Sequence, residues 1–234
     1  MQQSAQEREK VSGVEALYPF LYTGQSDLAV VLQEVRRSTE EKAREIMALR
    51  DWLGHELASR LSACAHAMAQ AFRAHGKLFA FGNGGSATDA QAMVQLFLHP
   101  PRGQPLPAFA LTNDTAVVTA LANDVGFDVV FARQIAAFGA AGDIAVGIST
   151  SGNSANVIQA CEEATRRGLL TVGLAGYNGG AMAEAASIAH LFVVPSSSVH
   201  RIQEAQTTLY HVLWELTQEA LKGGRSCDPA ARSG

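Results

Sequence analysis

The sequence predicts an α/β protein, a three-layer α/β/α sandwich around a parallel five-stranded sheet, preceded by an N-terminal helical segment. Short, wholly apolar runs recur from Lys77 onward, as expected of strands that are covered on both faces. Amphipathic stretches of crossover length separate these runs, which favours parallel strands joined by helices. Two longer amphipathic stretches precede the first run and predict the added helical segment.

The N-terminal part of the chain is expected to contain an irregular extension followed by two helices. Residues 1–25 form the extension, because Pro19 and Gly24 argue against a long helix there. Residues 26–75 are predicted to form two helices that meet near residue 50, each with an apolar stripe among charged positions. Such a pair of helices can cover one face of a sheet or form a bundle between subunits. We expect an oligomerisation segment.

Residues 76–222 are expected to form the sheet domain, and residues 223–234 a disordered tail. The predicted strands lie near 77–82, 107–112, 143–149, 169–174 and 190–194. The predicted helices lie near 86–98, 115–122, 127–139, 153–167, 179–187 and 200–222. In an open parallel sheet with right-handed crossovers, ligands bind outside the carboxyl ends of the strands. Functional residues are therefore expected directly after strands.

Composition and charge exclude several classes of protein. The chain has 234 residues, of which 47% are hydrophobic and 17% charged, enough to build a sizeable core. Its formal net charge is −4, so its overall charge does not mark it as a nucleic-acid binder. The sequence has no apolar run long enough to span a membrane and no signal-peptide core, which predicts a cytoplasmic protein.

The cysteines of the chain give no sign of disulfides or of a metal site. Cys64, Cys161 and Cys227 are odd in number, lie far apart and have no metal-binding spacing. Cys64 and Cys161 are expected to be small apolar packing residues. This cysteine usage agrees with a reducing cytosol.

Two turns rich in glycine and serine carry most of the functional information. The first, Gly82-Asn83-Gly84-Gly85-Ser86, follows an apolar run, and the second, residues 149–154, reads STSGNS after another such run. Each turn is predicted to connect a buried strand to a helix, which points backbone N–H groups and the positive end of the helix dipole at one place. Neither turn contains Lys or Arg, so neutral donors would hold a bound phosphate. Together the turns predict a phosphate-ester site.

Other interpretations of the first turn have less support. Residues 82–87 formally fit a G-x-G-x-x-A dinucleotide fingerprint, but residues 100–104 lack the acidic residue expected about 20 positions later. A P-loop is excluded because no Gly-Lys-Ser/Thr follows the turn. A purely structural tight turn stays the alternative for either segment taken alone.

Four segments of the chain occur together in a known family. They are GNGGS with Asp89 downstream, Ala122-Asn123-Asp124, GDIAVGISTSGNSANVI, and Arg201-Ile202-Gln203-Glu204. They resemble the sugar isomerase (SIS) domain from about residue 50 to residue 222, and within it the phosphoheptose isomerase branch, which acts on sedoheptulose 7-phosphate. The resemblance implies an SIS, flavodoxin-like sandwich and a homotetramer with active sites between subunits.

The resemblance also implies roles for individual residues. It implies that the sugar phosphate is held by Ser86, Ser149, Thr150, Ser151 and Ser154, and that the first turn of this substrate site is lined by Asn83, Gly84 and Gly85. Asn123 and Asp124 are expected to contact sugar hydroxyls, and Gln203 to reach the substrate or a metal. His211 matches the family histidine that moves a proton near C1 and C2, and a core or interface histidine is the alternative interpretation. Two turns of helix separate His211 from Gln203, so both lie on one broad face.

This chain departs from the family at its catalytic pair. Aldose–ketose isomerisation needs a base that moves a proton between neighbouring carbons and an acid at the carbonyl. The resemblance places a His and, four residues later, a Glu in the helix after GNGGS, where some members bind zinc together with the Gln and His of the last helix. Ala92 and Leu96 stand at these positions and can neither take a proton nor bind zinc, so no metal or other cofactor is expected. His99, His200 or a residue of a partner subunit are the candidates for compensation.

Three functions agree with these observations. We favour a phosphosugar-binding protein of the phosphoheptose isomerase type, with catalysis weakened or altered by Ala92 and Leu96. One alternative is an active sedoheptulose 7-phosphate isomerase of heptose synthesis, in which His211 and Gln203 carry the catalysis. The other is a non-catalytic interaction module like the SIS protein that binds the bacterial replication initiator. The expected partners are a sugar phosphate and copies of the same chain in a tetramer, without membrane or direct nucleic-acid contact.

Overall fold

The computed structural model describes residues 28–223 of the chain. The chain divides into two compact units between Glu45 and Ile46, and the helix α2 (Leu28–Glu56) crosses this boundary. In the first unit, the guanidinium of Arg37 bonds the carboxylates of Glu34 at 2.6 Å and Glu41 at 3.0 Å, about one helical turn away on either side. The expectation for residues 1–25 lies outside the described residues.

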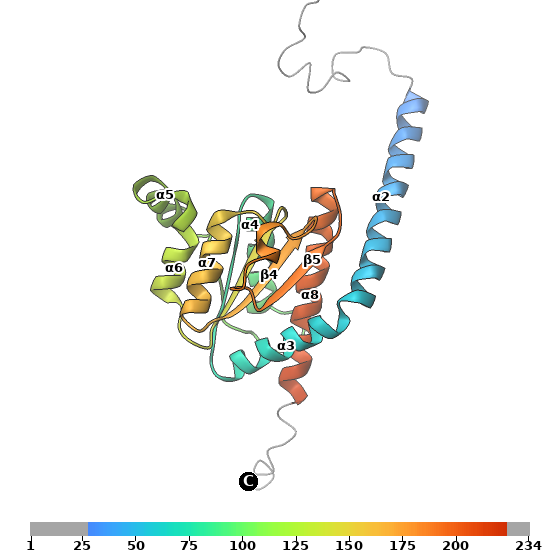
Figure 1. Ribbon diagram of the computed structural model, residues 1–234. Coiled ribbons are helices and arrows are strands. Elements are labelled where there is room, and N and C mark those ends of the chain that lie inside the picture. The colour runs from blue at the N-terminus through green and yellow to red at the C-terminus, as the bar shows by residue number, and fades with distance from the viewer. Residues whose placement is uncertain (1–27, 224–234) are drawn as a thin grey trace, which may run out of the picture. The chain divides into compact units, whose positions relative to one another are not determined.

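The second unit is built on a parallel five-stranded sheet, as the sequence predicts (Figure 1). Its strands are β1 (Leu78–Gly82), β2 (Ala108–Ala110), β3 (Ile144–Ser149), β4 (Leu170–Gly176) and β5 (His190–Val194). They lie in the order β2-β1-β3-β4-β5, and every neighbouring pair is parallel. The order changes direction between β1 and β3, so the loops after these two strands open at a topological switch point.

Helices cover both faces of the sheet and complete the three layers. They are α3 (Ala58–Arg73), α4 (Gly85–Leu98), α5 (Thr115–Asp124), α6 (Val130–Phe138), α7 (Ala155–Arg166) and α8 (Val199–Gly223), with the 3-10 turns η2 (Phe127–Val129) and η3 (Gly180–Ala183). One face of the sheet packs against α3, α4 and α8, and the other against α6 and α7 (Figure 1).

Alternate residues of each strand supply the two cores. Leu78 and Ala80 of β1 belong to the core shared with α3, α4 and α8, whereas Phe79 and Phe81 belong to the core shared with α6 and α7. Every residue of β1 is buried, because a parallel sheet is covered on both faces. The apolar runs in the sequence are therefore explained by burial on two sides.

One predicted helix is wrong. The stretch 179–187 forms only the short turn η3, because Gly179 and Gly180 adopt positive φ angles of 91° and 51° and interrupt helical geometry.

The two N-terminal helices meet later than predicted. The helix α2 continues to Glu56 and breaks at Leu57 instead of near residue 50. Leu53 and Leu57 are both buried and lie one turn apart, so the additional turn of α2 places both side chains in the core.

The described cysteines pack as predicted. Cys64 and Cys161 are each 0% exposed, and burial raises the pKa of both thiols to about 12, which leaves them protonated at neutral pH. Cys227 and the predicted tail after Gly223 lie outside the described residues. Among the helices that the structure describes, none has the length and apolar character needed to cross a membrane.

Candidate functional site

The first glycine-rich turn connects β1 to α4. Strand β1 ends at Gly82 and α4 begins at Gly85, with Gly84 as the N-cap residue at φ 54° and ψ −123°. A residue with a side chain would be strained in this conformation, so the position favours glycine. No side chain caps α4. The N–H groups of Ser86 and Ala87 bond the carbonyl oxygens of Asn83 and Gly84, each at 3.0 Å, whereas the Gly85 N–H bonds no group of the described residues and stays available to a ligand.

The second turn connects β3 to α7 in a similar way. Strand β3 ends at Ser149 and α7 begins at Ala155, and the hydroxyls of Ser149 and Ser154 share a hydrogen bond of 2.9 Å. Ser154 is the N-cap residue of α7, but its side chain does not cap the helix. Gly152, at φ 68°, packs so closely against the Gly179 carbonyl that no side chain would fit. The N–H groups of Val157 and Ile158 bond the Ser154 carbonyl oxygen, so α7 presents the N–H groups of Ala155 and Asn156 next to the hydroxyls.

The helix α5 of the same unit differs from α4 and α7 because a side chain caps its N-terminus. Asp114 is the N-cap residue of α5, and its side chain accepts a hydrogen bond of 3.0 Å from the N–H of Val117. The helices α4 and α7, which follow the predicted phosphate turns, have no such bond. Within the described residues, the N–H groups of Gly85, Ala155 and Asn156 at the start of these helices bond no other group, and they are the kind of donor that an anion satisfies.

Sheet pairing and one pair of side chains bring the two turns together. Gly82 at the end of β1 pairs with Ile148 of β3. Just beyond the strands, the carboxamides of Asn83 and Asn156 exchange two hydrogen bonds of 2.8 and 2.9 Å. Asn156 is 2% exposed, and sequence reasoning did not single it out. Its only signal in the sequence is its place in the segment ISTSGNSANVI, which also carries the second turn.

The helix α8 places a carboxamide, that of Gln203, next to the first turn. The carboxamide of Gln203 lies directly against Gly85, where even a methyl group would collide with it. His211 lies two turns further along α8, and its side chain is exposed, so it is not a core residue. The His211 Nδ1–H donates to the carbonyl oxygen of Thr207 at 2.8 Å, which leaves Nε2 as the unprotonated nitrogen of the neutral ring.

Two further ionisable residues lie where α4 packs against α8. Tyr210 is buried, and its ring stacks on that of His211 with centroids 5.0 Å apart. Burial raises the pKa of the Tyr210 hydroxyl, and negative charge on Asp89 raises it further. Burial also raises the pKa of the Asp89 carboxyl, to about 6. The sequence analysis noted Asp89 as part of the family motif without a role and did not consider Tyr210.

The positions of the family's catalytic pair hold no reactive group. Ala92 is exposed on α4, and Leu96 packs against the core shared by α3, α4 and α8. Gln203 and His211 supply two possible zinc ligands, whereas a catalytic zinc site normally has three protein ligands. Among residues 28–223, no cluster of three His, Cys, Asp or Glu side chains could hold a metal. The residues present therefore do not fit the zinc site of the family.

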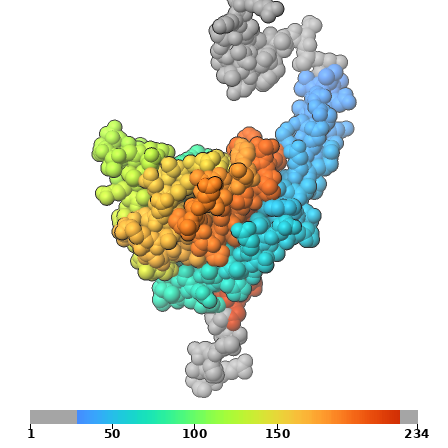
Figure 2. All heavy atoms as spheres, viewed as in Figure 1, coloured from blue at the N-terminus to red at the C-terminus, as the bar shows by residue number. Residues whose placement is uncertain are grey.

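Asn123 and Asp124 lie at the end of α5. Both side chains are exposed, and the Asn123 amide donates to the Asp124 carboxylate at 2.7 Å. The helix has no buried residue and makes its main contacts with η2 and α6, and Figure 2 shows this yellow-green segment protruding from the body of the second unit. The structure does not bring this pair together with the two turns. Their contact with sugar hydroxyls stays a prediction.

The two histidines considered as substitutes for the catalytic pair lie at helix ends. His99 follows the last residue of α4, which puts a helix of 14 residues, about 21 Å long, between it and the first turn. His200 is exposed in the first turn of α8, one turn before Gln203. His200 is therefore the better placed of the two.

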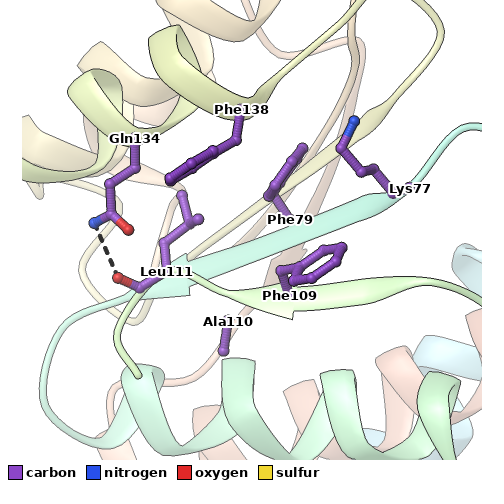
Figure 3. Close-up of a pocket in the computed structure, with 7 residues that line it drawn as sticks. All are labelled: Lys77, Phe79, Phe109, Ala110, Leu111, Gln134 and Phe138. Carbon is purple, nitrogen blue, oxygen red and sulfur yellow. Dashed lines mark hydrogen bonds between the residues drawn. The ribbon is translucent and has the colours of Figure 1, made fainter. Parts of the chain in front are cut away.

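A separate cavity of about 370 Å³ lies near the start of β1 (Figure 3). It is lined by Lys77, Phe79, Phe109, Ala110, Leu111, Gln134 and Phe138. Its walls are mainly apolar, and the rings of Phe79 and Phe109 stack with centroids 5.8 Å apart. None of the predicted phosphate residues lines this cavity, which is thus distinct from the two turns.

The fold and the paired turns define the class of protein. The model of the SIS domain family matches residues 43–176, and the chain belongs to this family. Within the family, it is similar to phosphoheptose isomerases. The phosphoheptose isomerase of Aquifex aeolicus is 41% identical over 192 residues, which are 81% of this chain and 97% of the relative. That of Geobacter sp. strain M21 is 40% identical over 195 residues, or 82% of this chain and 97% of the relative.

Solved structures give the same result. The phosphoheptose isomerase of Neisseria gonorrhoeae matches with a TM-score of 0.74 and 37% sequence identity, over 79% of this chain and 99% of that chain. The phosphoheptose isomerase of Francisella tularensis matches with a TM-score of 0.73 and 31% identity, over 81% of this chain and 98% of that chain. The predicted fold class and family are thereby confirmed.

Proposed function

We propose that this chain is a phosphosugar-binding protein of the phosphoheptose isomerase type, whose ligand is of the sedoheptulose 7-phosphate class. We further propose that Ala92 and Leu96 weaken or alter its catalysis. Two uncapped helix N-termini, held together by Asn83 and Asn156, support this function most directly. The similarity to phosphoheptose isomerases at about 40% identity supports the ligand class.

Neutral groups of the two turns are expected to hold the phosphate. A hydrogen bond to a charged group contributes about 1.5–3 kcal/mol, so several such bonds can bind a phosphate without a Lys or Arg. The expected donors are backbone N–H groups of the two turns and the hydroxyls of Ser86, Ser149, Thr150, Ser151 and Ser154. Gln203 lies against Gly85 and is expected to contact the sugar next to the phosphate.

The residues at positions 92 and 96 are expected to lower the catalytic rate more than the affinity for the phosphosugar. A well-placed general acid or base contributes about 10²–10⁴-fold to rate, and neither Ala92 nor Leu96 can act as one. The carboxamide of Gln203 can orient a carbonyl or hydroxyl group of the substrate but cannot accept its proton. His211 is the one member of the family's set that can still do so.

An active isomerase is the second candidate. The observation that favours it is the His211 ring, whose hydrogen bond to Thr207 leaves Nε2 able to accept a proton from a substrate carbon. His200, one turn before Gln203, is a candidate for the second proton-transfer group.

Proton exchange at C1 and C2 distinguishes these functions. Purified protein, sedoheptulose 7-phosphate and deuterated water are followed by NMR. Saturable shifts of protein resonances without exchange are the expected result. Exchange or aldose product would establish an active isomerase instead. Absence of both shifts and exchange would remove the phosphosugar site and favour the interaction module.

We also propose that the protein is a cytoplasmic homotetramer. The family resemblance implies this assembly, and the exposed apolar residues of α2 support it. Val31, Leu32 and Val35 are 40%, 59% and 56% exposed, which is unusual for large apolar side chains grouped on one helix.

A further inference from the structure

Asp89 is the only ionisable residue of α4. It follows Gly85 by one helical turn, so its Cα lies about 6 Å along the helix axis from the residue that contacts Gln203. Its position on α4 therefore places a carboxyl group close to the uncapped N-terminus that forms half of the proposed phosphate site. The functions proposed above give this carboxyl no role.

The surroundings of Asp89 do not neutralise it. Its Oδ2 atom is buried and has no hydrogen-bond partner within the described part of the chain, where no Lys or Arg forms an ion pair with it either. On α8, the phenol of Tyr210 lies near enough that negative charge on Asp89 raises its pKa, and the ring of His211 stacks on that of Tyr210 with centroids 5.0 Å apart. Burial raises the pKa of the Asp89 carboxyl to about 6.

The other elements packed against α4 carry no compensating charge toward Asp89. Strand β2 reads Ala108-Phe109-Ala110 and has no ionisable side chain. Lys77 lies just before β1, at the opposite end of that strand from Gly82, and its Nζ is bound to Asp143 at 2.7 Å. Asp143, in turn, directly precedes β3 at the same distant edge of the sheet. A charge on Asp89 thus acts on the phosphate site without local compensation.

A phosphate ester and an ionised Asp89 are therefore in conflict. The proposed site holds its ligand with neutral donors only, since neither turn contains Lys or Arg. A carboxylate in a partly buried environment one helical turn from the site repels a bound anion, and the repulsion is greater for a doubly charged phosphate than for a singly charged sulfate ester. Protonation of Asp89 removes the conflict and creates an O–H group that can donate a hydrogen bond.

We propose that Asp89 is a specificity-determining residue of the phosphate site, which must take up a proton from solvent when a doubly charged phosphate ester binds. The uptake is one carboxylate becoming one carboxylic acid, with no other bond made or broken. This inference rests on the proposed phosphosugar-binding function. By linkage, the bound ligand raises the proton affinity of Asp89 as much as protonation raises the affinity for the ligand.

Calorimetry measures the proton uptake directly. Binding of sedoheptulose 7-phosphate is titrated at pH 7.5 in buffers with different enthalpies of ionisation, and the slope of the observed enthalpy against these values counts the protons taken up. On binding the ligand, the wild type is expected to take up as many as one proton more than Asp89→Asn does. Protons released by the ligand itself contribute equally to both proteins and cancel in the comparison.

The affinity has a matching pH dependence. Between pH 5.5 and pH 8, the affinity of the wild type is expected to fall on the order of tenfold relative to that of Asp89→Asn. A sugar sulfate ester is expected to show a smaller fall. Asp114→Asn, which changes a carboxylate at the N-cap of α5, is the matched control and is expected to behave like the wild type.

Equal proton numbers for the wild type and Asp89→Asn would overturn the role of Asp89 and leave the phosphosugar site intact. If sedoheptulose 7-phosphate does not bind to the wild type at all, both fail together. If Asp89→Asn does not fold, the carboxyl carbon of Asp89 is titrated by NMR in the wild type with and without ligand. A pKa of Asp89 that rises on ligand binding supports its role, and an unchanged value overturns it.

Discussion

The carboxamides of Asn83 and Asn156 are joined by two hydrogen bonds, each side chain donating once and accepting once. One residue follows β1 and the other lies in the first turn of α7. Strand pairing aligns Gly82 with Ile148, and the amide pair extends this alignment beyond the end of the sheet. The distance between the two helix N-termini is therefore set by a specific contact, which is what a site shared by two turns requires.

Replacement of Asn156 by alanine is expected to lower both stability and phosphosugar affinity. The change leaves the Asn83 amide without its partner, which costs about 1–3 kcal/mol for a buried polar group. Urea unfolding measures the first effect and calorimetry the second. Asn178→Ala, which removes an exposed side chain that accepts one bond of 3.2 Å from the N–H of Gly180, is the control. An Asn156→Ala protein as stable as this control would contradict the role of the pair.

Loss of two hydroxyls from the second turn is expected to weaken phosphosugar binding on the order of a hundredfold. Ser151→Ala combined with Ser154→Ala removes two hydrogen bonds to a charged group, each of about 1.5–3 kcal/mol. Calorimetry with sedoheptulose 7-phosphate measures the change. Ser59→Ala, on the exposed side of α3, is the matched control. Unchanged affinity in the double variant would remove the phosphate assignment.

Protein purified without chelators is expected to contain no stoichiometric zinc. Metal analysis near one zinc per subunit would show that other residues replace the missing ligands.

Restoration of the family pair, Ala92→His with Leu96→Glu, is expected to give near-stoichiometric zinc. It should also raise the rate of proton exchange by about 10²–10⁴-fold. Ala92→Gln with Leu96→Gln is the control. Because Leu96 packs against the core, thermal unfolding of both variants checks that they fold.

Charges on the apolar part of α2 are expected to dissociate the proposed tetramer. Leu32→Glu with Val35→Glu places two like charges where a subunit interface would bury apolar side chains, and light scattering should show a smaller particle. Arg36→Ala, on the same helix, is expected to leave the particle size unchanged. If the wild-type protein is itself a stable monomer, this result would contradict the proposed tetramer.

The stability of the fold is expected to depend on Asp89 and on pH. The folded-state pKa of Asp89, about 6, lies above its ordinary value of 3.8, so the folded protein holds this proton more tightly than the unfolded chain. Stability from this group is therefore complete below pH 3.8 and is lost as the pH rises through 6. Asp89→Asn should be more stable than the wild type at pH 8, by about 1–2 kcal/mol after allowance for solvent screening, and equal to it near pH 4. Equal pH profiles of urea unfolding would contradict this.

Strand positions, sheet type and the two turns could be predicted from the sequence, because each depends on local patterns. The run ahead of Gly82 is wholly apolar, since β1 is buried on both faces, and Gly84 of the turn occupies a backbone conformation that other residues avoid. The helix expected over 179–187 failed for a local reason too, because its two opening glycines adopt positive φ angles. The absence of a catalytic pair at Ala92 and Leu96 needed only the identity of these residues.

The sequence by itself determined the fold class, the family and the strand ends at which a ligand is expected, because hydrophobic period and turn chemistry are local properties. The tertiary structure alone decided which distant residues meet. It paired Asn83 with Asn156, placed Gln203 against Gly85 and put the partly buried Asp89 carboxyl near Tyr210. These contacts depend on how strands pair and how α4 packs against α8, and no local pattern encodes the distance between residues so far apart in the chain.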